Sequence, residues 1–557
     1  MRIGRRSLDL AAVVGLVALA ALLRLPNLAT RGTWDADQGH DMLVLRSFVV
    51  DGVVPLLGPP TSIGDVHHGA LYYYLLAPAA FLTGGDSPLA VVLEIALAGI
   101  AAVAVTWWLA RSIGGPVAGL VAGLVLAVST SAVDGSTFIW NPNLIALSSA
   151  IALAGAWRAW TTRRVAWWVV AALGTAVTVQ CHVLGLAMAP VIGVLLVADW
   201  RRRGRGPERR AAAWAGVAWL LIVVGSYLPL AIHELRFDFS EVQAALAYLR
   251  SGGDPTAAGP LVRFPIVSLR VLSWPLTGLI TEAAVPALLA AIAVIAIVVL
   301  RWRAAEPGER VAIRWLGLGL LWTCVFLTVA APSLAVVVPD LPNDHYHAFA
   351  DPMVVVVIGL GAGAAWRAVL PRRGAAAAAS TAAAGPIQKG PTGPGPSAPT
   401  DPGPSAPTDP SPSAPTAPTL PRILVGGAVA VLCLFNLATQ PPAVNPDGGF
   451  PAAADAGARI VASTGDEEVQ MRSLPDFKSV EAYAYPIVRD GHVLSSDVIP
   501  GNLVIICDAR FEAAIGAACN GPAEDRLVAT SSPSGLRLAD RFEAAPGRFI
   551  SVYLESP

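Results

Sequence analysis

Long runs of apolar residues recur along most of the chain, and they constrain its fold more than any other feature. A bilayer core of about 30 Å needs roughly 20 apolar residues in a helix, because each residue advances the helix by about 1.5 Å. Only 14% of the residues are charged, against about 25% in a soluble domain, so a soluble enzyme is excluded. The sequence therefore predicts an all-α polytopic membrane bundle of about 11 spans. The predicted spans are 8–24, 88–110, 116–133, 142–158, 165–181, 183–199, 211–232, 283–300, 311–331, 352–370 and 423–440.

The arginine-rich loops predict the direction of each span. Short cytoplasmic loops collect Lys and Arg, and every added span reverses the side of all later loops. Two apolar segments are marginal as spans, because 69–83 is short and 264–281 contains Arg270 and Pro275. If neither crosses, all the arginine-rich loops fall inside, so we expect both segments to lie at the outer interface. Those loops are at Arg111, 158–164, 201–210, 301–314 and 367–373.

The chain divides into four parts. Residues 1–370 form the predicted bundle, and 371–421 read as a disordered cytoplasmic linker, because Pro, Ala, Ser and Thr dominate and cannot build a core. Residues 422–440 form the last span. That span exports 441–557 to the outer face.

The exported part has the pattern of a small α/β domain. Helix-like stretches at 453–463 and 510–518 alternate with strand-like stretches at 503–507 and 548–554. Cys507 and Cys519 are its only cysteines, and an oxidising exterior favours a disulfide between them over two buried thiols.

The first outer loop, 25–87, is longer than a connection requires and is rich in acids, imidazoles and phenols. Asp35, Asp37 and Asp41 cannot lie unpaired in lipid, so we expect them to line a wet cavity. A carboxylate at such a low-dielectric rim has a raised pKa and is suited to accept a proton. The alternative is that Asp35 caps a helix starting near Gln38.

This arrangement resembles the polyprenyl-phosphate-dependent membrane glycosyltransferases of the GT-C superfamily, in particular the protein-mannosyltransferase and aminoarabinose-transferase branch. In that family an Asp-Glu pair opens the first outer loop and a His/Pro-rich segment leads into Leu-Tyr-Tyr. Here 37–38 reads Asp-Gln, and 67–73 reads His-His-Gly-Ala-Leu-Tyr-Tyr. Weaker similarities lie at 139–143, 180–182 and 227–234. The resemblance covers roughly 1–370 and leaves 441–557 without a match.

The resemblance implies an inverting glycosyltransferase in the cell membrane. The donor would be a polyprenyl-phosphate sugar, and the acceptor a hydroxyl of an extracytoplasmic cell-wall glycan, lipid-linked glycan or protein. Asp37 would be the general base and Asp35 its catalytic neighbour. Gln38 in place of Glu leaves a divalent metal possible, but we assign no metal ligands. The expected substrate-binding residues are Gln38, Asp41, His67, His68, Tyr72, Asn141, His182, His345 and His347.

Simpler interpretations remain open for several of these residues and for the chain. His68 and His182 could be hydrogen-bonded histidines at helix ends, and the tyrosines at 72–74 could form an interfacial aromatic belt. The chain could instead be a transporter or flippase, although acids and histidines cluster in outer loops and not at mid-membrane. It could also be a membrane-anchored binding protein that acts through 441–557. The balance of 38 basic and 39 acidic residues excludes a nucleic-acid partner.

Overall fold

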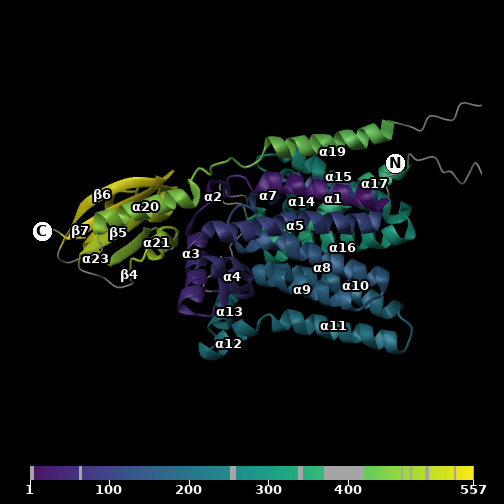
Figure 1. The fold of residues 1–557 in the computed structure, drawn as a ribbon, viewed down its shortest axis with the longest axis horizontal. Coiled ribbons are helices and arrows are strands. Elements are labelled where there is room, and N and C mark those ends of the chain that lie inside the picture. Colours follow the sequence, from purple (N-terminus) through teal and green to yellow (C-terminus); the bar gives the residue numbers. More distant parts are fainter. Residues whose placement is uncertain are drawn as a thin grey trace, which may run out of the picture.

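The computed structural model describes residues 5–61, 66–250, 259–336, 343–368, 420–465, 468–476, 480–495, 501–531 and 535–555. Figure 1 shows two parts: a bundle of roughly aligned helices and, at one end of it, a small sheet flanked by helices. The predicted fold class, a membrane bundle with a C-terminal α/β domain, is confirmed. Apart from residues 420 and 421, the predicted linker lies outside the described residues.

Each predicted span contains or overlaps a helix of the bundle. These helices are α1 (Arg5–Arg24), α5 (Pro88–Gly114), α6 (Pro116–Val128), α8 (Ile145–Thr162), α9 (Ala166–Cys181), α10 (Met188–Arg202), α11 (Pro207–Gly225), α15 (Ala284–Ala304), α16 (Pro307–Ala330), α17 (Asp351–Ala368) and α19 (Leu420–Ala438).

Fewer helices meet the length and hydropathy of a complete span than the sequence predicts. Within the described ranges, seven helical segments are long and apolar enough to cross a membrane. An eighth is added if α11 and α12 (Leu228–Arg236), which are bent by 45°, form one span. Helices α6, α9 and α19 are apolar but shorter. The count of eleven spans therefore stays a prediction.

Helix α17 forms the centre of the bundle. The most apolar 18-residue stretch of Asp344–Ala368, the segment that contains α17, is 83% buried in the protein. The corresponding stretches of α15 and α1 are only 17% and 11% buried, so these helices present their apolar side chains outward to lipid. Small residues let α17 approach α6 closely: a Cβ added at Gly359 would lie 2.4 Å from the Ala118 carbonyl oxygen. Close approach through small residues is a common basis of helix packing in membranes.

Short elements connect the long helices. In the first outer loop they are α2 (Leu28–Arg31), α3 (Ala36–Arg46), η1 (Ser47–Asp51), β1 (Leu57–Pro60), β2 (His67–Gly69) and α4 (Leu71–Thr83). The others are α7 (Thr130–Asp134), η2 (Asn141–Leu144), η3 (Val183–Ala187), α13 (Ser240–Arg250), α14 (Pro260–Thr277), η4 (Pro332–Ala335) and η5 (Asp344–Ala350). Strands β1 and β2 pair antiparallel. The two marginal segments are thus helices α4 and α14, and their interfacial position stays a prediction.

The C-terminal domain is built on a five-stranded sheet in the order β4-β3-β5-β7-β6. Its strands are β3 (Val469–Leu474), β4 (Leu494–Ser495), β5 (Asn502–Asp508), β6 (Leu536–Ala545) and β7 (Arg548–Glu555). Strand β3 runs parallel to β4 and β5, whereas β7 pairs antiparallel with β5 and β6. Its helical elements are α20 (Gly449–Thr464), α21 (Glu481–Arg489), η6 (Ala509–Phe511), α22 (Glu512–Ile515) and α23 (Pro522–Ser531).

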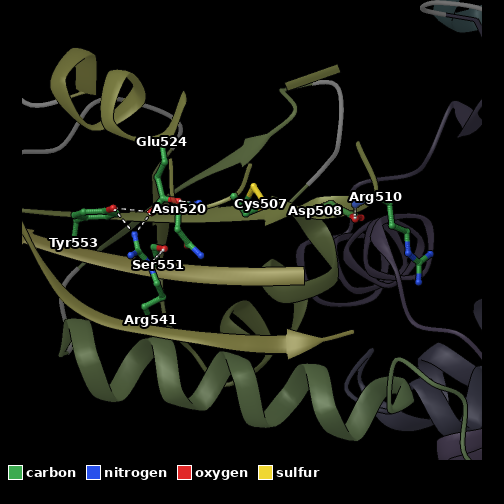
Figure 2. Close-up of a disulfide and its surroundings, with 9 residues drawn as sticks. Cys507, Asp508, Arg510, Asn520, Glu524, Arg541, Ser551 and Tyr553 are labelled. Carbon is green, nitrogen blue, oxygen red and sulfur yellow. Dashed lines mark hydrogen bonds and ion pairs between the residues drawn. A yellow bond between two sulfur atoms is a disulfide. The ribbon is translucent and has the colours of Figure 1, made fainter. Parts of the chain in front are cut away.

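Most sequence predictions for this domain are confirmed. A helix contains 453–463, and strands contain 503–507 and 548–554. The helix-like stretch predicted over 510–518 is confirmed only in part: the short 3-10 helix η6 and the four-residue helix α22 lie there, and Gly516 ends α22 with a left-handed φ of 73°. The predicted disulfide between Cys507 and Cys519 is confirmed, as Figure 2 shows.

Candidate functional site

A cavity of about 750 Å³ lies where the bundle meets the C-terminal domain. The first outer loop, the 131–146 region, η5 and the C-terminal domain all contribute walls to it. Its polar lining includes Arg24, Asp35, Asp37, Gln38, Asp134, Asn143, His345, Asp351, Asp447, Asp508, Arg510 and Arg548. Residues from both ends of the sequence thus share one hollow.

Helix α3 starts at this cavity with a capping box. The Asp35 carboxylate accepts a hydrogen bond from the Ala36 amide at 2.8 Å, and the Gln38 Oε1 accepts one from the Asp35 amide at 2.8 Å. The interpretation of Asp35 as a helix cap is confirmed, because this side chain satisfies a backbone donor that the helix leaves free. The Gln38 Nε2 donates to the Ile139 carbonyl oxygen at 2.9 Å. Both ends of the Gln38 amide are therefore used within the protein.

Asp37 lies in the first turn of α3 and is exposed at the cavity. Asp35 is also held from the other side by Arg548, whose Nη2 lies 3.1 Å from the Asp35 Oδ1 and 3.3 Å from the Asp508 Oδ2. Burial lowers the pKa of Arg548, but the Asp35, Tyr483 and Asp508 groups raise it more, so its net pKa is raised. Asp35 is thus fixed by a cap and an ion pair, and Asp37 is the exposed acid of the two.

Asp41 lies one turn further along α3, and it is buried. The hydroxyls of Tyr72 and Tyr73 donate to its two oxygens at 2.7 and 2.8 Å. Burial raises the pKa of Asp41 to about 7, although the two tyrosine hydrogen bonds oppose the shift. The raised pKa that we expected of the loop acids thus occurs at Asp41. The hydrogen bonds of its carboxylate connect α3 to α4. Neither Asp41 nor Tyr72 is among the residues that line the cavity.

The predicted histidines form a row that reaches the cavity at one end only. The ring of His68 lies 4.9 Å from that of His182, and the ring of His182 lies 5.4 Å from that of His345. Of these three, His345 lines the cavity, with its ring 4.3 Å from that of Trp140. Burial lowers the pKa of His68 to about 4 and that of His182 well below its usual value. Both rings are therefore neutral at pH 7 and supply no charge for a phosphate.

The remaining predicted binding residues have partners inside the protein. His67 pairs with Glu241. The Glu241 carboxylate accepts a hydrogen bond from the His67 backbone amide at 2.7 Å and lies 2.9 Å from the His67 Nδ1. His347 is buried 3.1 Å from Asp344. The Asn141 amide nitrogen donates to the Cys181 carbonyl oxygen. These three residues do not line the cavity, and their role in substrate binding stays a prediction.

The C-terminal domain supplies several cavity residues that sequence reasoning missed. Asp508 is the last residue of the buried strand β5, Arg510 lies two residues beyond it, and Arg548 begins β7 beside it. The only local signal was that charged residues follow the apolar run at 503–507 directly. Asn143 and Asp134 were missed as well, although the segment around 139–143 was singled out.

The residues at positions 37 and 38 do not fit a metal centre. The Gln38 oxygen is used by the capping box. Among the residues that the structure describes, no three His, Cys, Asp or Glu side chains come together as a metal-binding group.

Comparison with known proteins identifies the fold. The family model of dolichyl-phosphate-mannose-protein mannosyltransferases matches residues 67–228, which include β2, α4 and the helices from α5 to α11. No curated protein matches the sequence. The structure of ArnT from Cupriavidus metallidurans bound to undecaprenyl phosphate is similar to this chain, with a TM-score of 0.58 and 13% identity, over 99% of this chain and 98% of that one.

Two further structures are similar to this chain in fold. ArnT from the same organism in the apo state gives a TM-score of 0.57 at 14% identity, over 98% of both chains. The archaeal oligosaccharyltransferase AglB from Archaeoglobus fulgidus, in complex with an inhibitory peptide and a dolichol-phosphate, gives 0.51 at 12% identity, over 99% of this chain and 74% of that one. The resemblance to GT-C glycosyltransferases that the first outer loop suggested is confirmed at the level of the fold.

Proposed function

We propose that this chain, a multi-pass membrane glycosyltransferase with the GT-C fold, moves a sugar from a polyprenyl-phosphate donor to a hydroxyl of an extracytoplasmic acceptor, with Asp37 as the general base. The acceptor is a cell-wall glycan, a lipid-linked glycan or a protein. The observation that carries the proposal is the cavity beside the bundle that Asp37 lines and faces.

The chemistry needs one base and one departing anion. The acceptor oxygen forms a bond to the anomeric carbon of the sugar while the bond from that carbon to the phosphate oxygen breaks. The hydroxyl proton passes to the Asp37 carboxylate, and polyprenyl phosphate leaves with the electron pair. A single displacement of this kind inverts the anomeric centre, and a positioned carboxylate base contributes roughly 10²–10⁴-fold to such a rate.

The surroundings of Asp37 support this assignment. Asp35 is held by the capping box and by Arg548, so the start of α3, and with it the backbone of Asp37, has one position relative to the cavity. Asp41 is buried under two tyrosine hydroxyls and is not exposed to a substrate. Among the three acids of the first outer loop that we predicted, Asp37 is the one suited to meet an acceptor hydroxyl.

The test is Asp37→Asn in the purified full chain, reconstituted in proteoliposomes. A panel of polyprenyl-phosphate sugars serves as donor, and release of polyprenyl phosphate is measured. We expect kcat to fall by about 10²–10⁴-fold with little change in KM for the donor, because the amide cannot accept the proton.

Asp51→Asn is the matched control. Asp51 is an exposed acid of the same outer loop, at the end of η1, and it does not line the cavity. This variant should turn over at the wild-type rate. A wild-type rate for Asp37→Asn would refute the base assignment.

A further inference from the structure

The charge of the cavity poses a problem for any ligand that carries a phosphate. Among the described lining residues, six are aspartates and three are arginines. A phosphate that enters such an acidic hollow is repelled unless a cation meets it. Which of the three arginines has donors available is therefore decisive.

Arg24 is used by the bundle. Its buried guanidinium donates to the Ser136 hydroxyl at 3.2 Å and to the carbonyl oxygens of Ala127 and Leu126 at 2.8 and 3.1 Å. Its donors hold the last turn of α6 and Ser136, so Arg24 is a structural residue.

The guanidinium of Arg548 is also engaged within the protein. It bridges Asp35 and Asp508, so its positive charge is balanced by two carboxylates before any ligand enters.

Arg510 differs from both. It is exposed, and within the described ranges no hydrogen bond or ion pair engages its guanidinium. Figure 2 shows its side chain beyond the end of the strand that carries Cys507 and Asp508, on the side where the purple ribbon of the N-terminal region lies. Five N–H donors on a planar cation suit a phosphate better than any other side chain does.

The segment that carries Arg510 is firmly held, although the side chain is exposed. The Asp508 Oδ1 accepts from the Arg510 backbone amide at 3.1 Å, and its Oδ2 pairs with Arg548. Three residues before Arg510, Cys507 is bonded to Cys519. Because the backbone is already fixed, anion binding has to immobilise only the side chain of Arg510, and no loop needs to be ordered.

We propose that Arg510 of the C-terminal domain binds the phosphate group of a substrate at the cavity. The inference rests on the proposed function, since it assigns a ligand chemistry to the same cavity. That phosphate belongs to the polyprenyl-phosphate donor or to a phosphate-bearing acceptor, and binding measurements separate the two sources.

The first measurement uses the purified full chain in detergent with undecaprenyl phosphate as the probe and undecaprenol, which lacks the phosphate, as its partner. Binding is followed by the shift of the thermal unfolding midpoint with ligand concentration. For Arg510→Gln we expect the Kd for undecaprenyl phosphate to rise about tenfold, because a hydrogen bond to a charged group is lost. The Kd for undecaprenol should stay unchanged. Arg510→Lys should retain part of the affinity as a point charge.

Arg526→Gln is the matched control, because Arg526 is an exposed arginine of α23 in the same domain and does not line the cavity. The second measurement repeats the titration with glucose 1-phosphate, a soluble phosphate monoester. If Arg510→Gln weakens the binding of undecaprenyl phosphate and not that of undecaprenol, the phosphate belongs to the donor. If it weakens only the binding of glucose 1-phosphate, the phosphate belongs to the acceptor.

Unchanged affinity for both phosphates, or an equal loss for undecaprenol, would overturn the proposal. These experiments measure no turnover. A wild-type rate for Asp37→Asn would therefore overturn the proposed base and leave the result on Arg510 intact.

Discussion

Neighbouring acids on one short helix have different roles in this protein. Asp35 caps α3 and pairs with Arg548, Asp37 is exposed at the cavity, and Asp41 is buried under two tyrosines. The sequence placed all three near a cavity because their charges exclude them from lipid, and Asp35 and Asp37 do line one, whereas Asp41 does not. It could not separate the roles, because these depend on Tyr72, Tyr73 and Arg548, whose contacts leave no local pattern.

His40 links this helix to the C-terminal domain and makes their contact depend on pH. Its Nδ1 lies 2.8 Å from the Glu481 carboxylate. Burial lowers the pKa of His40, but the hydrogen bond and charge of Glu481, with smaller contributions from Asp41 and Asp37, raise it more, so the net pKa is raised. A histidine whose folded-state pKa is raised stabilises the fold fully below the unfolded value of about 6.5. This stabilisation is lost as the pH rises through the folded-state pKa.

Glu481→Gln should therefore destabilise the protein by about 1 kcal/mol at pH 5.5 and by clearly less at pH 8.5. The measurement is the difference in unfolding midpoint between wild type and variant at each pH. This difference cancels the contributions of His68 and His182, whose lowered pKa values give the opposite slope. A difference that stays constant across this pH range would contradict the prediction.

At the scale of elements, the contact between α3 and α21 places the two parts of the molecule. The Trp34 Nε1 donates to the Ala482 carbonyl oxygen at 2.8 Å, and the Trp34 ring packs against Phe450 and Tyr485 at 4.7 and 5.8 Å. The Tyr485 hydroxyl donates to the Gly85 carbonyl oxygen at 3.0 Å. Apolar periodicity predicted most helices and strands, but it could not predict this contact, because it joins segments 400 or more residues apart.

Gly39→Ala tests that contact. An added Cβ would lie 2.0 Å from the Glu481 carbonyl oxygen, so α21 must move away from α3. We expect a loss of roughly 1–3 kcal/mol in unfolding free energy, together with reduced transfer activity, measured by thermal unfolding and by polyprenyl phosphate release.

Gly193→Ala in α10 is the control, because nothing lies within 4 Å of the position that its Cβ would take. It should leave stability unchanged or raise it slightly, as Ala favours helix over Gly. Equal behaviour of the two variants would show that α3 and α21 do not pack as described.

At the scale of the whole molecule, the arginine-rich loops and the cavity lie at opposite ends of the bundle. Counting charges predicted which loops face the cytoplasm, and the GT-C fold agrees with a multi-pass protein. The location of the cavity between bundle and C-terminal domain could not be predicted, because the resemblance stopped near residue 370 and the domain had no match.

The orientation can be measured with single cysteines. We expect Arg526→Cys, in the C-terminal domain, to react with an impermeant thiol reagent in intact cells, and Arg205→Cys, in the loop between α10 and α11, to react only after permeabilisation. Both positions are exposed. The native background is low, since Cys181, Cys324 and Cys433 are buried and the other two cysteines form the disulfide. The reverse labelling pattern would invert the topology.

The ion pair between Asp35 and Arg548 has a consequence for the biogenesis of the protein. Translation and membrane insertion run from the N-terminus, so the first acids reach the membrane surface long before their arginine has been synthesised. A nascent chain still attached to the ribosome has only one side of its cavity. The cavity is therefore complete only after the C-terminal domain has been synthesised and has docked on the bundle.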